Sequence, residues 1–241
     1  MALLEVRRLS KAFGGLRALR DVGFAVSEGE VLGVIGPNGS GKSTLFNIIA
    51  GAVPPTSGTV TFAGEVLTGR PPWAIARRGV GRTPQIPVIF PELSCLENVL
   101  VGAAFGCRRR RLPAALAHRE AMAALETVGL AGLAARPAPH LSLGQTKLLE
   151  LAMALAASPR LLLLDEPTAG LSPAAVKEAL EVIRGLRERG LTLLLIDHKL
   201  RAISAFATRA LALDRGEIIA EGSPGEVTAH PRVVKAYLGE G

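Results

Sequence analysis

A glycine-rich segment with one lysine and three hydroxyl-bearing residues lies in the first quarter of the chain. It consists of Gly36, Pro37, Asn38, Gly39, Ser40, Gly41, Lys42, Ser43 and Thr44. Glycines let successive backbone N–H groups turn toward a phosphate, and a helix that begins there adds partial positive charge. Lys42 is expected to reach the β- and γ-phosphates of a nucleotide, and Ser43 to offer its hydroxyl to Mg²⁺. An aliphatic run before the segment and a helical pattern after it supply the required strand–loop–helix context, so a chance glycine-rich turn is the weaker interpretation.

Two adjacent carboxylates follow a buried-strand pattern at residues 161–164, which are four consecutive leucines. Ligands of open α/β sheets bind at the carboxyl ends of the strands. We therefore expect Asp165 to hold Mg²⁺ through water and Glu166 to polarise the attacking water. The alternative is a solvated Asp-Glu turn before a proline.

Residues 191–196 repeat this arrangement and end in Asp197 and His198. Alone, a histidine just past a buried strand is more often structural. Here His198 is expected at the same sheet edge as Glu166, where it would donate a hydrogen bond to the γ-phosphate.

A second anion-binding pattern occupies residues 141–145. Ser142 and Gln145 have the spacing of a capping box, and Gly144 lacks a side chain at the start of an alanine- and leucine-rich helix. A fresh helix N-terminus of this kind attracts an anion. The sequence therefore predicts two phosphate-binding segments in one chain.

Strands and helices must position these groups. Short, partly alternating runs at 3–9, 21–26 and 59–63 predict an antiparallel or mixed sheet. Continuous aliphatic runs at 31–35, 161–164 and 191–196 predict parallel strands covered on both faces. Residues 209–220 have the pattern of a hairpin.

Helix signals dominate the middle of the chain. Ser94 and Glu97 form a second capping-box pair, while Ser172, Pro173 and Gly190 mark the two ends of another helix. Residues 94–157 carry little strand signal, which predicts a helical insertion into an α/β core.

The composition bounds the class of protein. The 241 residues carry 49% hydrophobic and 20% charged residues and a formal charge of +7, which fits a folded chain with an anionic partner. Cys95 and Cys107 have no metal-ligand spacing and suit a reducing compartment. We expect a cytosolic protein, because no signal peptide or membrane-spanning run is evident. Four consecutive arginines at 108–111 are expected to be a solvated run, with lipid headgroup contact as the minority interpretation.

Residues 141–145, placed before the 161–164 strand, resemble the signature motif of ABC-type ATPases. Further resemblances follow in the right order along the chain. Phe13 is similar to the residue that stacks on adenine, Gln85 to the glutamine that senses Mg²⁺ and the attacking water, and His198 to the switch histidine. Residues 169–172 resemble the loop that links two nucleotide sites.

The resemblance implies an α/β fold, namely an ABC-type P-loop ATPase with a RecA-like core, an N-terminal antiparallel β subdomain and a helical subdomain. Residues 1–241 would form one domain, with about 94–157 as the helical subdomain. It also implies ATP and Mg²⁺ as cofactors, with Ser43, Gln85 and Asp165 at the metal. Ser142, Gly144 and Gln145 would contact the nucleotide of a second ATPase subunit in a head-to-tail dimer.

In the family, the partners are transmembrane permease subunits and, indirectly, a substrate-binding protein, with the ATPase peripheral on the cytoplasmic face of the cell membrane. The segments at 13–16, 81–85, 96–102 and 236–239 are most similar to the ATP-binding subunit of branched-chain amino acid importers. Pro84, Lys199 and residues 146–148 depart from that group's pattern, which leaves the substrate open.

The sequence leaves three alternatives to the amino acid importer. The ATPase subunit of lipopolysaccharide export has nearly this length and a related ending. A nucleic-acid-associated ABC ATPase is disfavoured because the chain has neither a second ATPase unit nor zinc-binding cysteines, so no nucleic-acid partner is expected. A small-molecule kinase is disfavoured by residues 141–145. The sequence does not decide whether the second ATPase subunit is another copy or a sibling.

Overall fold

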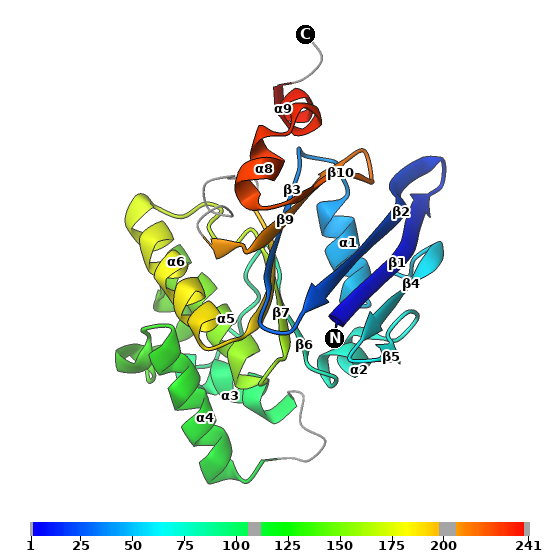
Figure 1. The fold of residues 1–241 in the computed structure, drawn as a ribbon. Helices are drawn as coiled ribbons and strands as arrows, with labels where there is room; N and C mark the ends of the chain where they lie inside the picture. Colours follow the sequence, from blue (N-terminus) through cyan, green and yellow to red (C-terminus); the bar gives the residue numbers. More distant parts are fainter. Residues whose placement is uncertain (1, 106–111, 198–205, 239–241) are drawn as a thin grey trace.

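Two β-sheets that share one hydrophobic core form the centre of the computed structural model, which describes residues 2–105, 112–197 and 206–238. The first sheet is antiparallel, with strand order β2-β1-β4-β5. Its strands are β1 (Ala2–Phe13), β2 (Leu16–Ser27), β4 (Ser57–Phe62) and β5 (Glu65–Val66). This sheet lies on the right of Figure 1.

The second sheet has strand order β10-β9-β3-β8-β7-β6 and is parallel except for the antiparallel pair β9 and β10. Its strands are β3 (Val31–Ile35), β6 (Val80–Thr83), β7 (Leu161–Asp165), β8 (Thr192–Ile196), β9 (Arg209–Asp214) and β10 (Glu217–Gly222). Because β3, β7 and β8 are adjacent and parallel, their carboxyl ends share one edge. That edge carries the predicted site residues.

Helices cover the second sheet. Three of them adjoin single strands of this sheet along the chain: α1 (Lys42–Ile49) follows β3, α2 (Pro72–Ala76) precedes β6, and α6 (Pro173–Glu188) joins β7 to β8. A group in the lower part of Figure 1 comprises α3 (Cys95–Phe105), α4 (Ala114–Thr127), the short η1 (Ala131–Leu133) and η2 (Ala138–His140), and α5 (Leu143–Ala156). At the top lie α8 (Pro224–Ala229) and α9 (Pro231–Leu238).

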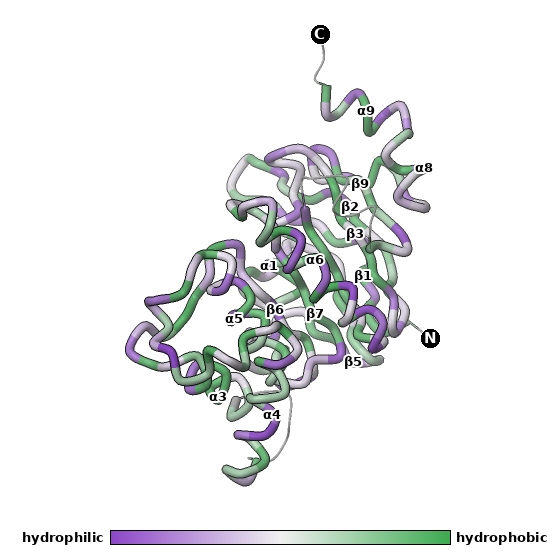
Figure 2. Tube along the Cα trace, turned by 90° about the vertical axis from the view of Figure 1, so that its left-hand side faces the viewer, coloured by the Kyte–Doolittle hydropathy of each residue, from purple (hydrophilic) through white to green (hydrophobic). Residues whose placement is uncertain are grey.

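The inner parallel strands β3, β7 and β8 are largely apolar on both faces, as their aliphatic runs predicted. On β7, Leu162 and Leu164 pack into the core shared with α3–α6, whereas Leu161 and Leu163 pack into the core shared with α1 and the antiparallel sheet. Side chains alternate across a strand, so a strand covered twice needs apolar residues at every position. Figure 2 shows hydrophobic colouring along these inner strands.

The structure confirms most predicted elements and lengthens several. The runs at 3–9 and 21–26 belong to twelve-residue strands β1 and β2, joined at Gly14 and Gly15. Ser142 and Ser172 cap α5 and α6 as predicted, and Gly190, with φ +77°, follows the end of α6. Between residues 95 and 156 the described chain forms helices and no named strand. The strand β6 and the helices α2, α8 and α9 were not predicted.

Candidate nucleotide site

The phosphate-binding loop joins β3 to α1, as the sequence predicted. Gly36, Gly39 and Gly41 have φ angles of +152°, +77° and +107°, which side chains rarely adopt. A Cβ at Gly41 would lie 2.5 Å from the carbonyl oxygen of Ala18. Glycine at this position is therefore required both by backbone conformation and by the close approach of β2.

Lys42 begins α1 and its side chain turns back into the loop. Its Nζ donates hydrogen bonds to the carbonyl oxygens of Gly36 (2.7 Å) and Pro37 (2.8 Å) and lies 3.3 Å from the Ser40 hydroxyl. Burial lowers the pKa of the Lys42 ammonium, and the carboxylates of Glu166 and Asp165 counteract that shift. The ammonium is thus held inside the loop with two carboxylates nearby.

Asp165 ends β7 and is buried, as expected for a residue at the sheet edge. Nη2 of Arg82 lies 3.3 Å from its Oδ2, and Nη1 of the same guanidinium donates to the side-chain oxygen of Asn47 (2.7 Å). Burial raises the pKa of the Asp165 carboxyl, although the Arg82 charge opposes the shift. Sequence reasoning did not anticipate this ion pair.

Glu166 follows directly with a φ of +49°, so the chain turns sharply after Asp165 and the two side chains diverge. Its backbone N–H donates to the carbonyl of Ile196 (2.8 Å), and its Oε2 accepts from Nε2 of Gln85 (3.0 Å). Nζ of Lys147, on α5, donates to the Glu166 carbonyl (3.0 Å). The structure therefore brings Gln85 and Glu166 into contact, as their predicted shared role requires.

A cavity of about 730 Å³ joins these groups. Its predicted lining residues are Phe13, Asn38, Gly39, Gly41, Lys42, Ser43, Thr44, Gln85 and Glu166. Gly36, Pro37, Ser40 and Asp165 do not line it. Leu16, Arg17, Ala18, Arg20 and Arg215 also line it and were missed by sequence reasoning. Arg17 and Arg20, which follow the Gly14-Gly15 turn, are the sequence feature that could have predicted this basic part of the lining.

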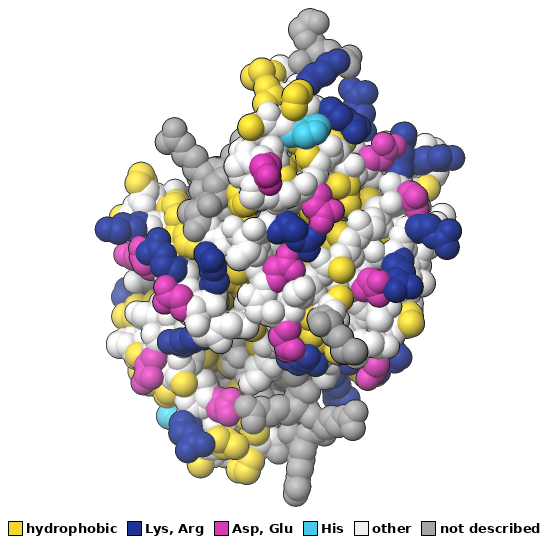
Figure 3. All heavy atoms as spheres, viewed as in Figure 1, with side chains coloured by type: hydrophobic (Ala, Val, Ile, Leu, Met, Phe, Trp, Pro, Cys, Tyr) yellow, Lys and Arg dark blue, Asp and Glu magenta, His cyan; other side chains and the backbone are white. Residues whose placement is uncertain are grey.

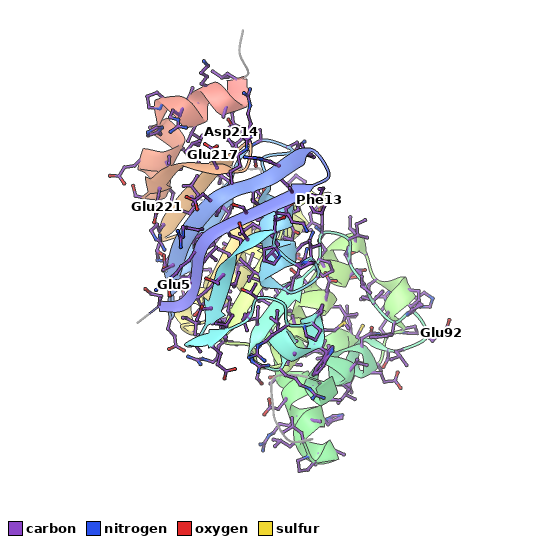
Figure 4. All side chains as sticks on the ribbon, turned by 90° about the vertical axis from the view of Figure 1, so that its right-hand side faces the viewer. Glu5, Phe13, Glu92, Asp214, Glu217 and Glu221 are labelled. Atoms are coloured by element: carbon purple, nitrogen blue, oxygen red, sulfur yellow. The ribbon has the colours of Figure 1, made fainter. Side chains whose placement is uncertain are left out.

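Phe13 lies at the tip of the β1–β2 hairpin, at the edge of this cavity (Figure 4). Phe13 is 47% exposed, and Nζ of Lys11 lies 4.7 Å from the centre of its ring. An exposed aromatic face at the mouth of a phosphate-binding cavity is available for stacking on a base.

The second anion-binding segment does not line this cavity. Ser142 and Gln145 form the predicted capping box, in which Ser142 Oγ accepts from the Gln145 N–H (3.3 Å) and Gln145 Oε1 from the Ser142 N–H (3.0 Å). Gly144 lies against α6, where a Cβ would be 2.9 Å from that of Ala175. Gln145 lines a separate cavity between α4 and α6. Within one chain, the two segments therefore do not share a ligand cavity.

His198 lies outside the described residues, so its predicted role stays a prediction. The residue before it, Asp197, is buried, and its Oδ2 accepts a hydrogen bond from the Thr168 hydroxyl (2.8 Å). Cys95 is buried and has a free thiol, whereas Cys107 and the arginines at 108–111 also lie outside the described residues.

The residues present suit a nucleotide with Mg²⁺. A Cβ at Gly36 or Gly41 would lie 2.2 Å from the carbonyl oxygen of Leu213 or 2.5 Å from that of Ala18, so the loop can take this shape only with glycine there, and Lys42 supplies a cation inside it. Among the described residues, no group of three or more His, Cys, Asp or Glu side chains could hold a metal. Mg²⁺ commonly uses one or two carboxylates with phosphates and water, which is the donor set that Ser43, Gln85 and Asp165 would complete.

A glycine-rich loop between a parallel strand and a helix, facing a buried carboxylate at the end of a second strand, defines a P-loop ATPase. The ABC transporter family profile matches residues 19–169, and a profile described as branched-chain amino acid ATP-binding cassette transporter matches residues 217–241. The chain belongs to the family of ABC transporter ATPases, which bind and hydrolyse ATP.

Among individual relatives, BraF of Pseudomonas aeruginosa is 40% identical to this chain. BraF is a high-affinity branched-chain amino acid transport ATP-binding protein, and the alignment covers 99% of this chain and 98% of BraF. LptB of Escherichia coli, a lipopolysaccharide export system ATP-binding protein, is 37% identical and covers 100% and 98%.

Solved structures agree with the fold. The ADP conformation of the ATP-binding cassette MJ1267 has a TM-score of 0.88 at 33% identity, with 100% of both chains covered. The cassette MJ0796, dimeric in a post-hydrolysis state with ADP and Pi, has a TM-score of 0.81 at 27% identity, with 92% and 98% covered. Among the residues that the structure describes, no helix has the length and apolarity needed to span a membrane.

Proposed function

We propose that this ATPase powers the import of branched-chain amino acids, as a peripheral subunit on the cytoplasmic face of the cell membrane. The observation that carries the proposal is the match of residues 217–241 to the branched-chain profile, beside the 40% identity to BraF over nearly the whole chain. Lipopolysaccharide export is the second candidate, because LptB is 37% identical over the full length.

The site residues support a defined division of labour during hydrolysis. Lys42 and the loop N–H groups would hold the β- and γ-phosphates, while Phe13 would stack on the base. Glu166, whose carboxylate lies 3.0 Å from the Gln85 amide, would accept a proton from the attacking water, with Gln85 orienting it. Mg²⁺, held by Ser43, Gln85 and Asp165, would neutralise charge on the phosphates. His198 would donate a hydrogen bond to the γ-phosphate.

Two ATPase subunits would be needed for a complete site. Ser142, Gly144 and Gln145 lie outside the cavity that contains Lys42 and Glu166. A head-to-tail pairing would bring the α5 N-terminus of one subunit to the phosphates held by the other, where the helix dipole favours negative charge. The pair would consist of two copies or of this chain with a sibling.

The segment after Gln85 suits contact with a permease. Ile86, Val88 and Phe90 are 78%, 65% and 44% exposed, an apolar surface that water disfavours. It borders the helices at 94–157, which we propose as the helical subdomain of a single 1–241 ABC ATPase domain. We propose that a cytoplasmic helix of a transmembrane permease subunit docks there, with a substrate-binding protein acting indirectly. On the face in Figure 3, basic and acidic side chains are interspersed, which gives no support to a nucleic-acid partner.

The role of Glu166 is tested by Glu166→Gln, which keeps the side-chain shape and a hydrogen-bond acceptor but removes the proton-accepting carboxylate. Because a general base contributes about 10²- to 10⁴-fold, we expect ATP turnover to fall by that factor while ATP binding persists and a closed dimer accumulates. Glu178→Gln, an exposed glutamate on α6, is the matched control. Normal turnover in Glu166→Gln would remove Glu166 from this role.

The transported substrate is tested by co-purifying the permease subunits and reconstituting them with this ATPase. We expect ATP-dependent uptake of leucine, isoleucine and valine, lost with Glu166→Gln. ATP-dependent extraction of lipopolysaccharide without amino acid uptake would replace the import proposal with the export one.

A further inference from the structure

The chain's single tyrosine connects its C-terminal helix to the phosphate-binding loop. Tyr237 lies on α9, and its phenol oxygen accepts a hydrogen bond from the backbone N–H of Gly36 at 2.9 Å. The two residues are 201 positions apart in sequence. The contact lies outside the nucleotide cavity that Lys42 and Glu166 line.

Gly36 needs such a partner because its N–H falls just beyond the sheet. The paired part of β3 ends at Ile35, opposite Ala212 of β9, and Gly36 is buried. A Cβ at Gly36 would lie 2.2 Å from the carbonyl oxygen of Leu213 and 2.6 Å from the Ser40 hydroxyl, which shows how closely the surroundings approach. A buried backbone N–H without an acceptor is unfavourable, and the Tyr237 hydroxyl removes that cost.

The tyrosine is held firmly enough to fix the loop. Val233, one turn earlier on α9, is 1% exposed. The Tyr237 side chain packs against the core that the second sheet shares with α3–α6. The helix also contacts α8, β9 and β10. Burial, together with the nearby Asp197 carboxylate, raises the pKa of the Tyr237 phenol, so the hydroxyl stays neutral while its oxygen accepts from Gly36.

We infer that Tyr237 is a positioning residue for nucleotide binding, which holds the first glycine of the phosphate loop and so couples the docking of α9 to the loop's shape. The inference rests on the phosphate-binding role proposed for residues 36–44. Linkage makes the coupling reciprocal. If docked α9 favours the loop conformation that binds nucleotide, then bound nucleotide strengthens the docking of α9.

The decisive variant is Tyr237→Phe, which keeps the ring and removes only the hydroxyl. We expect the dissociation constant for a non-hydrolysable ATP analogue, measured by calorimetry on the full chain, to rise roughly fivefold to thirtyfold, the range for one lost buried hydrogen bond. Val234→Ala is the matched control, because Val234 lies on the same helix but is 41% exposed. Its affinity should stay at the wild-type value.

Hydrogen exchange at the Gly36 amide, followed by NMR with ¹⁵N-glycine, reports the bond itself. We expect exchange to be at least tenfold faster in Tyr237→Phe than in wild type or Val234→Ala. In the wild-type chain, bound nucleotide should slow amide exchange in α9. This measurement does not depend on whether a variant folds.

A merely structural tyrosine gives a different result. The inference is overturned if Tyr237→Phe melts at a lower temperature but binds the analogue within twofold of wild type, or if nucleotide leaves α9 exchange unchanged. Failure of the wild-type chain to bind nucleotide would instead refute the proposed role of the loop.

Discussion

Glu150 offers a quantitative test, because it is a carboxylic acid buried in the centre of α5. Glu150 is only 7% exposed, and its Oε1 accepts a hydrogen bond from the Val88 N–H at 2.9 Å. Burial raises the pKa of Glu150 from 4.5 to about 7, although the Val88 N–H and the Lys147 ammonium oppose the shift. The folded chain therefore holds a proton that the unfolded chain has already released over this pH range.

The sign of the effect on stability follows directly. A folded-state pKa above the unfolded value contributes stability at low pH that is lost as pH rises from about 4.5 to about 7. The full shift corresponds to about 3 kcal/mol. Roughly 2.5 kcal/mol of this loss falls between pH 5 and pH 8, because some ionisation of the unfolded chain precedes pH 5.

The test is Glu150→Gln, which keeps an oxygen acceptor for Val88 but cannot ionise. We expect the free energy of unfolding of the variant, relative to wild type, to increase by roughly 2.5 kcal/mol between pH 5 and pH 8. Urea unfolding followed by far-ultraviolet circular dichroism at both pH values measures it. Taking the difference cancels other titrating groups, including Asp165, that both proteins share.

Glu226→Gln is the control with the opposite shift. The hydroxyl and backbone N–H of Ser223 lower the pKa of Glu226, so the stability that it contributes is fully present above about pH 4.5 and is lost only at lower pH. The deficit of Glu226→Gln should therefore be the same at pH 5 and pH 8. If Glu150→Gln also stayed parallel to wild type over that range, Glu150 would not be the buried acid that its environment implies.

Two further variants test local packing. Gly41→Ala should abolish nucleotide binding, measured with a fluorescent ATP analogue, because its Cβ would meet the Ala18 carbonyl at 2.5 Å. Gly39→Ala has nothing within 4 Å of its Cβ. It should cost only about 1 kcal/mol of stability, because alanine is strained in the left-handed backbone conformation. Thr168→Val should lower the free energy of unfolding by about 1–3 kcal/mol, because it removes the buried hydrogen bond to Asp197; a melting temperature equal to wild type would show that this bond contributes nothing.

Local patterns made much of the fold predictable from sequence. The loop at 36–44 is recognisable from the spacing of its glycine, lysine and hydroxyl-bearing residues. The caps at Ser142 and Ser172 accept hydrogen bonds from N–H groups three residues away. Continuous aliphatic runs likewise identify β3, β7 and β8, since a strand covered on both faces is apolar at nearly every inner position. Each of these signals is contained within a few residues.

The remaining features depend on partners distant in sequence. The four-residue strand β6 contains Gly81 and Arg82, gives no strong pattern, and gains its register only by pairing with β7. Arg17 and Arg20 line the cavity because the β1–β2 hairpin folds over the phosphate loop. The contacts of Tyr237 with Gly36 and of Arg82 with Asp165 also join elements far apart in the chain. No local pattern specifies such tertiary contacts.

The long-range contacts of α5 would transmit movement between the sites of the proposed dimer. Ser142 caps its N-terminus, Lys147 holds the Glu166 carbonyl one turn later, and Glu150 holds the Val88 N–H beside the exposed apolar segment. A helix of 14 residues moves as a nearly rigid rod. Any displacement of its N-terminus by a partner's phosphate must therefore either carry Glu166 and Val88 along or stretch both hydrogen bonds. The same helix thus connects the proposed trans contact, the proposed general base and the proposed permease surface.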